Sequence, residues 1–284
     1  MTDIKIYGEY ETAWCPGCGN HDILAALKQA LANCGLKPEE VVMVSGIGQA
    51  AKAPHYINAN VFNGLHGRAL PAATGIKLAN PELNVIVESG DGCLYGEGGN
   101  HFPAAIRRNI NITVLAHDNS IYGLTKGQAS PTSTAGVVSR AEPFGVFSIP
   151  FNPVEIAIAL GAGFVARGFS GDRENLPGLI AQAVKYPGFA LVDILTPCVS
   201  FNKFNTFAWY KDHVRPLPQT YDPADKAAAL AAAEPADDIF YTGVIYKREE
   251  RPTMESHFPM LAQGALARQP VDMQMLRSIM ESFK

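Results

Sequence analysis

The residues of this chain with the clearest potential for chemistry are the triplet Gly90-Asp91-Gly92 and, farther along, Asn119. Because the carboxyl ends of neighbouring parallel strands meet at the ligand-binding edge of an open α/β sheet, we expect the two motifs to lie together. Glycines let the backbone approach a phosphate closely, and Asp91 and Asn119 offer the oxygen ligands that Mg²⁺ shares with phosphates. The pattern predicts a magnesium–diphosphate site, although an Asp-Gly pair alone more often marks a turn. Each motif follows an apolar run typical of a buried strand, at residues 84–89 and 111–116.

Cys15 and Cys18 form a second candidate site, a single CxxC motif. Such a motif is compatible with half of a zinc site, a redox disulfide or half of an iron–sulfur site. A zinc site needs a second pair, which the sequence lacks, and a thioredoxin-like site needs a preceding strand, which residues 1–12 do not predict. The odd total of five cysteines favours free thiols or metal thiolates over a secreted disulfide framework.

The elements that must position these motifs alternate between helices and strands. Short intervals between the two are typical of βαβ units with a parallel sheet covered on both faces. We therefore predict an α/β fold, with a doubly wound, mainly parallel sheet of about six strands and helices on both faces. The predicted strands are residues 41–44, 84–89, 111–116, 164–166 and 189–195, and the predicted helices are residues 20–33, 69–79, 100–108, 153–160 and 174–184.

Two stretches depart from this alternation. Residues 126–150 are rich in Ser, Thr and Pro with little periodicity, which indicates a long functional loop. After residue 215 prolines interrupt the chain, residues 224–233 predict an Ala-rich helix, and residues 252–284 predict an extended arm that ends in a helix. We therefore expect an α/β domain at residues 1–215, including the CxxC segment, and a C-terminal arm at residues 216–284 that packs on the domain or on a partner.

The composition is that of an ordinary globular protein. A net charge of −4 with interspersed signs gives no basic stripe, so neither nucleic acid nor an anionic membrane surface is an expected partner. Because residues 1–6 form no apolar run, we expect no signal peptide, and no later stretch reaches the ~20 apolar residues that span a bilayer. We expect a cytoplasmic protein.

The whole pattern resembles the β subunits of the 2-oxoacid:ferredoxin oxidoreductases, which are thiamine-diphosphate enzymes. The resemblance covers roughly residues 12–215, with the motifs in order and at family-like spacing. It rests on residues 14–19 (WCPGCG), 45–48 (SGIG), 66–71 (HGRALP), 74–81 (TGIKLANP), 117–128 (HDNSIYGLTKGQ), 130–133 (SPTS) and 196–198 (TPC).

This resemblance implies a thiamine-diphosphate-binding fold. Mg²⁺ would be held by the side chains of Asp91 and Asn119 and by the backbone carbonyl of Ile121. His66 would contact phosphate, with a capping or core histidine as the alternative. The backbone facing the diphosphate would be that of Gly90, Gly92 and Cys93, and the cofactor would also be lined by the turn Ile47, Gly48, Gln49 and Ala50.

The ring end of the cofactor is where the chain looks incomplete. By resemblance, Gly123 and Leu124 support the pyrimidine and thiazolium rings. Activation of the cofactor also needs a carboxylic acid beside the pyrimidine, whereas Glu88 and Glu97 flank the diphosphate motif at the other end. In the family this glutamate comes from the α subunit. We therefore expect the chain to be inactive alone and to work in an αβ heterodimer or an (αβ)₂ assembly.

For the cysteines, the resemblance implies a [4Fe–4S] cluster held by Cys15, Cys18 and Cys198. The family's usual fourth cysteine position is occupied by Gln49, which leaves three possibilities: a non-cysteine ligand, an open iron or a lost cluster. Cys34 is no substitute, because the helix at residues 20–33 carries it roughly 20 Å away. Cys93 more plausibly packs beside the phosphate motif as a small buried thiol.

The activity implied by the resemblance is the coenzyme A-dependent oxidative decarboxylation of a 2-oxoacid, with electrons passing through the cluster to ferredoxin. The pattern is closest to the 2-oxoglutarate branch, which forms succinyl-CoA and CO₂, and the alternatives are pyruvate or a broad range of 2-oxoacids. Lys126 is a candidate partner for the substrate carboxylate, or else an ordinary solvated lysine. Arg140, in the same loop, is a weaker candidate.

Two functions of other classes remain open. A non-oxidative thiamine-diphosphate decarboxylase would explain the magnesium motif but would leave the cysteines without a purpose, and an active preparation without iron would favour it. A non-catalytic iron–sulfur electron carrier would explain the cysteines alone, and tight Mg²⁺-dependent binding of thiamine diphosphate would count against it.

Overall fold

The computed structural model describes residues 2–249 and 251–283 and contains one eight-stranded sheet. The strand order is β2-β1-β3-β4-β6-β5-β8-β7, and every neighbouring pair is parallel except β5 and β8. The predicted α/β fold with a mainly parallel sheet is confirmed. The strands are β1 Val41–Ser45, β2 Asn60–Asn63, β3 Asn84–Gly90, β4 Thr113–Asp118, β5 Phe164–Phe169, β6 Ala190–Leu195, β7 Val214–Pro216 and β8 Phe240–Lys247.

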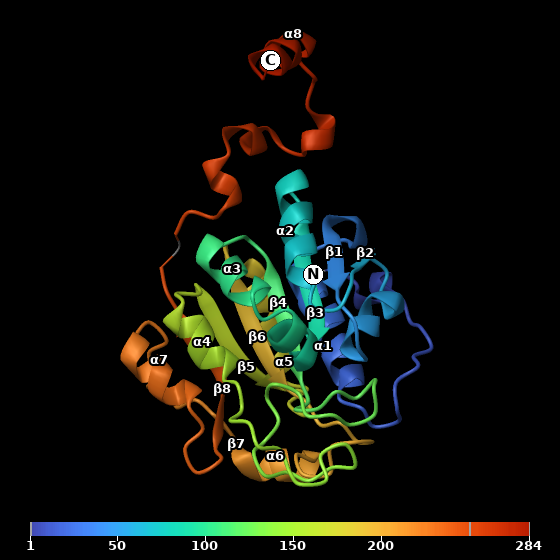
Figure 1. Cartoon of the computed structure of the whole chain (residues 1–284), viewed down its shortest axis with the longest axis vertical. Coiled ribbons are helices and arrows are strands. Elements are labelled where there is room, and N and C mark those ends of the chain that lie inside the picture. Colours follow the sequence, from blue (N-terminus) through green and yellow to red (C-terminus); the bar gives the residue numbers. More distant parts are fainter. Residues whose placement is uncertain (1, 250, 284) are drawn as a thin grey trace.

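Helices cover both faces of the sheet (Figure 1). One apolar core lies under α1 and α5, which pack on each other, and a second lies under α2, α3, α4 and α7. The helices are α1 Asn20–Asn33, α2 Ala69–Ala79, α3 His101–Arg108, α4 Pro153–Ala159, α5 Leu176–Lys185, α6 Phe207–His213, α7 Lys226–Ala233 and α8 Met273–Ser282. Short 3-10 helices lie at Ile4–Tyr7, Pro38–Glu40, Ala50–Tyr56, Glu255–His257, Pro259–Gln263 and Leu266–Arg268, and a π-helix lies at Gly92–Glu97.

The central strands are continuous apolar runs because helices bury them on both faces. In β3, Val85, Ile86 and Val87 alternate between the two cores, and all three are fully buried. Burial of each such side chain stabilises the fold by about 1.5–3 kcal/mol. The sheet that carries the two predicted motifs is therefore packed on both faces.

The expectation of about six strands was too low, and the strands it missed, β2, β7 and β8, lie at the two ends of the strand order. The four residues of β2 are all exposed, so the segment has no apolar alternation that marks a strand. β8 lies in the C-terminal segment, where its mostly half-buried residues pair antiparallel with β5. The assignment of residues 216–284 to a separate arm stays a prediction, with α7 and β8 packed on the domain and α8 carrying no buried residue.

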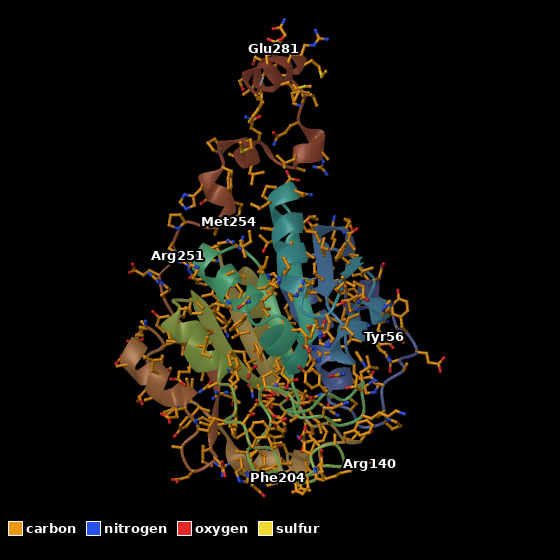
Figure 2. The ribbon with its side chains drawn as sticks, viewed as in Figure 1. Tyr56, Arg140, Phe204, Arg251, Met254 and Glu281 are labelled. Atoms are coloured by element: carbon orange, nitrogen blue, oxygen red, sulfur yellow. The ribbon has the colours of Figure 1, made fainter. Side chains whose placement is uncertain are left out.

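The two ends of the molecule differ in kind (Figures 1 and 2). Loops and α6 gather at the carboxyl ends of the parallel strands, near Arg140 and Phe204, whereas the chain beyond Met254 leads away from the opposite end to α8. The predicted long loop is confirmed, since residues 119–152 form no helix or strand beyond one isolated bridge. None of the helices within residues 2–249 and 251–283 is long and apolar enough to cross a bilayer.

Candidate active site

Asp91 lies at the end of β3, buried, and a hydroxyl from the long loop binds it. Thr132 Oγ1 is 2.7 Å from Asp91 Oδ2 and 2.6 Å from Asp118 Oδ1, at the end of β4. The hydroxyl faces both carboxyl groups as a donor and has a single proton to share between them. Thr132 therefore holds the two aspartates close to each other.

The pKa values of both aspartates are raised, chiefly by burial. Burial, followed by the negative charge of Asp118, raises the pKa of Asp91 to about 7. Burial also raises the pKa of Asp118. A divalent cation bound to such groups would favour their deprotonated form and relieve the repulsion, because metal ligation requires the deprotonated carboxylate. The donor set therefore fits Mg²⁺.

Asn119 and Ile121, the other predicted magnesium ligands, follow β4 at the same edge. Since Gly90 pairs with His117 in the sheet, the residues that follow each strand emerge beside each other. Asn119 Oδ1 accepts a hydrogen bond from Ile121 N at 3.1 Å and keeps a second lone pair for a cation. The turn is anchored by Asn202, whose Nδ2 donates to Asn119 O at 3.1 Å.

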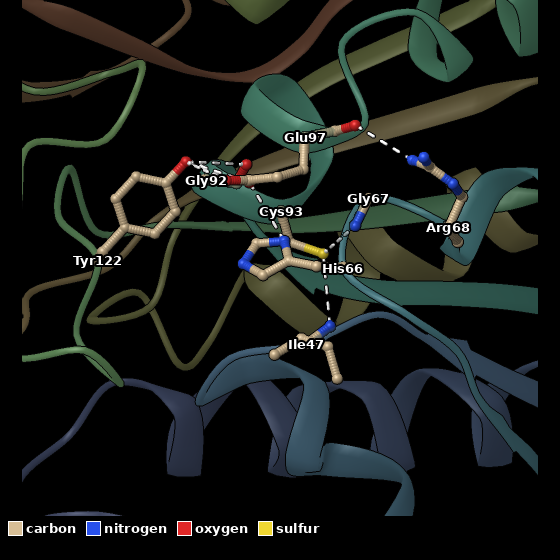
Figure 3. A network of polar contacts seen from close by, with 8 residues as sticks. All are labelled: Ile47, His66, Gly67, Arg68, Gly92, Cys93, Glu97 and Tyr122. Carbon is tan, nitrogen blue, oxygen red and sulfur yellow. Dashed lines mark hydrogen bonds and ion pairs between the residues drawn. The ribbon is translucent and has the colours of Figure 1, made fainter.

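Cys93 ties together the three segments predicted to surround the diphosphate (Figure 3). Its buried Sγ accepts hydrogen bonds from Ile47 N at 3.4 Å and from Gly67 N at 3.1 Å. The approach is close enough to need glycine: a Cβ on Gly46 would lie 2.4 Å from Cys93 Sγ. Cys93 is thus the small buried thiol that the sequence predicted, and it also acts as a hydrogen-bond acceptor for two turns.

His66 lies beside this cluster and faces an acid. Its Nδ1 is 3.1 Å from Glu97 Oε2, and Tyr122 donates to the same carboxylate at 3.2 Å. Burial and the charge of Glu97 raise the pKa of Tyr122 above its usual value. Glu97 therefore carries the local negative charge, and an incoming phosphate would have to share His66 with it.

Glu88, the other acid beside the motif, is fully buried. Its Oε1 lies 2.9 Å from His117 Nε2, and His117 Nδ1 lies 2.9 Å from Asn20 Oδ1. This chain of contacts joins the end of β3 to the first residue of α1, directly after the CxxC motif. Both glutamates have partners inside the protein, which agrees with the expectation that neither serves the pyrimidine ring.

The CxxC motif and a cysteine far from it in the sequence come together in one cavity. Cys15, Cys18 and Cys198 line it together with Gln49 and Gly123. Burial, with the neighbouring thiols contributing, raises the pKa of Cys18 to about 11. A Cβ on Gly123 would lie 3.7 Å from Cys198 Sγ, so the cavity directly adjoins the turn predicted to support the cofactor rings.

The two remaining cysteines lie outside this cavity. Cys34 follows the last residue of α1, and its Sγ donates to Ala181 O at 3.7 Å. Cys93 has its sulfur on the diphosphate turns, as described above. No three His, Cys, Asp or Glu side chains in the described part of the chain surround a single point as ligands of one metal ion. Neither predicted site requires three such side chains around one ion. The magnesium site relies partly on an amide oxygen and a backbone carbonyl, and the cysteines of an iron–sulfur cluster bind different iron atoms.

The ring-end residues are exposed. Leu124 leaves 42% of its surface in solvent at the tip of its turn, beside Gly123. Lys126 adopts a left-handed backbone with φ of 79°. Lys126 and Arg140 line one cavity of about 700 Å³ together with Ile121 and Phe201. Since Phe201 also lines the cysteine cavity, the two hollows adjoin.

Sequence reasoning missed Thr132 and Asp118 as parts of the site. Both lie inside motifs that carry the family resemblance, but neither position indicates a contact with Asp91. It also missed Ser200, which donates to Cys15 Sγ at 3.1 Å. The sequence shows a polar residue two positions after Cys198, but it does not indicate which residue that side chain contacts.

Comparisons with known proteins agree with this geometry. The family described as thiamine pyrophosphate enzyme, C-terminal TPP binding domain, matches residues 41–194, and the family described as the C terminal of the pyruvate ferredoxin oxidoreductase beta subunit matches residues 198–263. Subunit beta of 2-oxoacid:ferredoxin oxidoreductase 2 from Aeropyrum pernix is 42% identical over 268 residues, covering 90% of this chain and 87% of its own. The 2-oxoglutarate oxidoreductase subunit KorB from Mycobacterium tuberculosis is 45% identical, covering 68% of this chain and 52% of its own.

A solved structure extends the agreement to the whole fold. The 2-oxoglutarate:ferredoxin oxidoreductase from Magnetococcus marinus, with 2-oxoglutarate, coenzyme A and succinyl-CoA bound, superimposes with a TM-score of 0.91 at 35% identity, covering 98% of this chain and 96% of that one. The sheet edge with Asp91, the cavity with three cysteines and these similarities have one explanation: the chain belongs to the β subunits of the 2-oxoacid:ferredoxin oxidoreductases.

Proposed function

We propose that this β subunit binds thiamine diphosphate, Mg²⁺ and a [4Fe–4S] cluster, and that with its α subunit it oxidatively decarboxylates 2-oxoglutarate to succinyl-CoA and CO₂. Electrons leave through the cluster to ferredoxin. The observation that carries the proposal is the position of Gly123, in the turn after Asn119 and beside Cys198 in the cysteine cavity. The predicted ring support and the predicted electron acceptor are thus neighbours.

At the diphosphate end, the chain's own groups hold the metal and the phosphates. Asp91, Asn119 and the carbonyl of Ile121 supply oxygen ligands at the edge of the sheet. The turns held by Cys93 bring glycine backbone close to the same edge. These residues would fix the position of the cofactor, since the strands that carry them are buried on both faces of the sheet.

At the ring end, bound thiamine diphosphate supplies the electron sink that lets CO₂ leave a 2-oxoacid. Gly123 has no side chain and so leaves room for the cofactor rings. Leu124 offers an exposed apolar side chain that cofactor binding would cover. Glu88 and Glu97 flank the diphosphate motif, where they contact His117 and His66, so neither serves the ring end. The α subunit therefore has to supply the carboxylic acid.

Cations beside the site support a substrate with a carboxylate at its far end. Lys126, Arg140 and Lys203 line the cavity next to Ile121, and Glu142 is the acid among its described lining residues. A dicarboxylate such as 2-oxoglutarate has a second charge for this cavity, whereas pyruvate has not. Several relatives are named as 2-oxoglutarate enzymes, and others as broader 2-oxoacid enzymes. The second candidate is therefore a broad 2-oxoacid range that includes pyruvate.

The surface beside the site supports contact with the α subunit. Phe144, Phe147 and Ile149 in the long loop leave 101%, 95% and 90% of their surface in solvent. Exposed apolar side chains gathered on one loop mark a protein-binding surface. Because the loop also supplies Thr132 to Asp91, a partner docked there would cover the catalytic edge.

The test is anaerobic reduction of a viologen dye by the chain co-expressed with its α subunit. We expect coenzyme A-dependent reduction with 2-oxoglutarate, slower reduction with pyruvate, and none by the β chain alone. The Lys126→Ala complex should lose activity towards 2-oxoglutarate more than towards pyruvate. Release of CO₂ without dye reduction would instead identify a non-oxidative decarboxylase.

A further inference from the structure

Gln49 carries an unexplained feature of the cysteine cavity. The residue follows β1 in the turn that begins at Gly46, and it lines the cavity together with Cys15, Cys18 and Cys198. Its side-chain Oε1 is buried and has no hydrogen-bond partner among the residues that the structure describes. Leaving a buried amide oxygen unpaired costs about 1–3 kcal/mol, so such an atom calls for a ligand.

The backbone of Gln49 is held in place by the segment that carries the cysteines. Trp14, directly before Cys15, donates from Nε1 to Gln49 O at 2.8 Å. Gly48 has φ of 121°, a conformation that glycine permits, and it sets the direction of the turn. Gln49 itself is the N-cap of the 3-10 helix Ala50–Tyr56. These contacts hold the backbone of Gln49 beside the cavity that the residue lines.

Other polar side chains that line the cavity are already engaged. Asn20 Oδ1 lies 2.9 Å from His117 Nδ1, and Asn119 Oδ1 accepts from Ile121 N, with its remaining lone pair assigned to Mg²⁺ in the proposed function. Ser200 Oγ donates to Cys15 Sγ.

Thr196 Oγ1 also lacks a partner, but it is packed against backbone. A Cβ added to Gly19 would lie 2.0 Å from it, so that oxygen faces Gly19 at close range. Among the described residues that line the cavity, Gln49 Oε1 is the buried, unpaired oxygen not closed off in this way.

We propose that Gln49 Oε1 is the fourth protein ligand of the cluster held by Cys15, Cys18 and Cys198. This inference rests on the proposed function, since it needs the cluster to be present. A neutral amide oxygen is a harder and weaker ligand for iron than a thiolate. A cluster with this ligand carries one negative charge fewer than a cluster with four thiolates. The iron at that corner would be the most labile, and the cluster would be reduced at a higher potential than one with four thiolates.

The experiment compares the αβ complex, purified anaerobically, with its Gln49→Ala and Gln49→Cys variants. Iron content, the electron paramagnetic resonance spectrum and the reduction potential are measured, together with the rate at which limited ferricyanide oxidation produces a [3Fe–4S] signal. Loss of an outer-shell partner alone costs 10–100-fold in metal affinity, so Gln49→Ala should lose the labile iron at least about tenfold faster. Gln49→Cys should lose it more slowly than wild type and should have a lower potential.

Cyanide provides a direct probe of an open iron. It should change the resonance spectrum of Gln49→Ala and leave wild type unchanged. Gln182→Ala, which removes an exposed glutamine on α5, is the matched control and should behave as wild type in every measurement. Thiamine diphosphate content in each variant reports that the complex is folded.

The possible failures are distinguishable. If wild type and Gln49→Ala have the same spectrum, lose iron at the same rate and both bind cyanide, the fourth iron is open and Gln49 is not a ligand. If neither wild type nor Gln49→Cys retains iron while both retain thiamine diphosphate, the cluster of the proposed function is itself absent.

Discussion

The diphosphate end of the site and the cysteine cavity are neighbours, but they are built in opposite ways. Around Asp91 the carboxyl group, the loop hydroxyl and the Cys93 thiol all have partners within the chain. In the cysteine cavity, Cys15 is exposed and Gln49 has a buried oxygen without a partner among the described residues. The contacts around Asp91 form within the chain itself, whereas the cysteine cavity has donor atoms that a bound cofactor would engage.

The difference follows from the elements that supply each region. Asp91 and Asn119 follow two paired strands, whose hydrogen-bond register fixes their separation. The cysteines come from a loop before α1 and a loop after β6, and Gln49 comes from the turn after β1. Loops are joined by fewer contacts than strands, so a bound cluster would contribute more to order there than Mg²⁺ does at the sheet edge.

The largest expected effect is at the sheet edge. Asp91→Ala removes the buried carboxylate ligand, and we expect Mg²⁺-dependent affinity for thiamine diphosphate to fall at least about 100-fold, beyond the 10–100-fold typical of outer-shell changes. Titration calorimetry of the αβ complex measures it, with Asp222→Ala, an exposed aspartate, as the control. Unchanged cofactor affinity in Asp91→Ala would remove the magnesium assignment.

The complementary variant tests whether the two regions are independent. Cys18→Ser should remove most of the cluster iron, because a hydroxyl is a poor ligand for iron–sulfur clusters. Thiamine diphosphate content should stay within about twofold of wild type, because the paired strands rather than the cysteines hold the magnesium ligands in place. Iron and cofactor assays on one preparation give both numbers. Loss of both together would mean that the diphosphate end depends on the cluster for its order.

The pH dependence should also separate the regions. In the metal-free chain Asp91 has a pKa of about 7, so its proton competes with Mg²⁺ below that value. The affinity for Mg²⁺ should rise by up to about tenfold per pH unit towards pH 7 and level off above it. Between the usual aspartate pKa and about 7 the folded state holds a proton that the unfolded chain releases, so the metal-free chain should lose stability as pH rises.

Metal titrations and chemical unfolding at several pH values test this prediction. Saturating Mg²⁺ should abolish the loss of stability, because the cation replaces the proton. A metal affinity that does not change between pH 5 and 7 would show that Asp91 is already ionised, with a lower pKa than burial implies.

The smallest expected effect concerns Cys93. Cys93→Ala leaves the N–H groups of Ile47 and Gly67 without their acceptor, at a cost of about 1–3 kcal/mol each when buried. Affinity for thiamine diphosphate should fall by roughly tenfold, the equivalent of about 1.4 kcal/mol, without loss of iron. Cys93→Ser retains an acceptor and should recover most of the affinity. Equal affinities in all three proteins would mean that the two turns are held by other contacts.

Much of the framework was predictable because its elements are regular. The helix at residues 20–33 has the predicted bounds, since its apolar residues recur at helical spacing and face one core. β3 and β4 were predictable because both are buried runs. β2 and β8 were missed for the opposite reason: one is fully exposed and the other is mostly half-buried, so neither has the apolar alternation of a strand.

The sequence by itself determined the family, the strand-end position of Asp91 and Asn119, and the CxxC motif, because these depend on residue type and local spacing. Only the tertiary structure brought Thr132 and Asp118 onto Asp91, Cys93 onto two turns, and Gln49 among the cysteines. Those contacts join residues that the sheet and its loops bring together from distant parts of the chain. No local pattern records them, because a single hydrogen bond leaves no periodicity in the sequence.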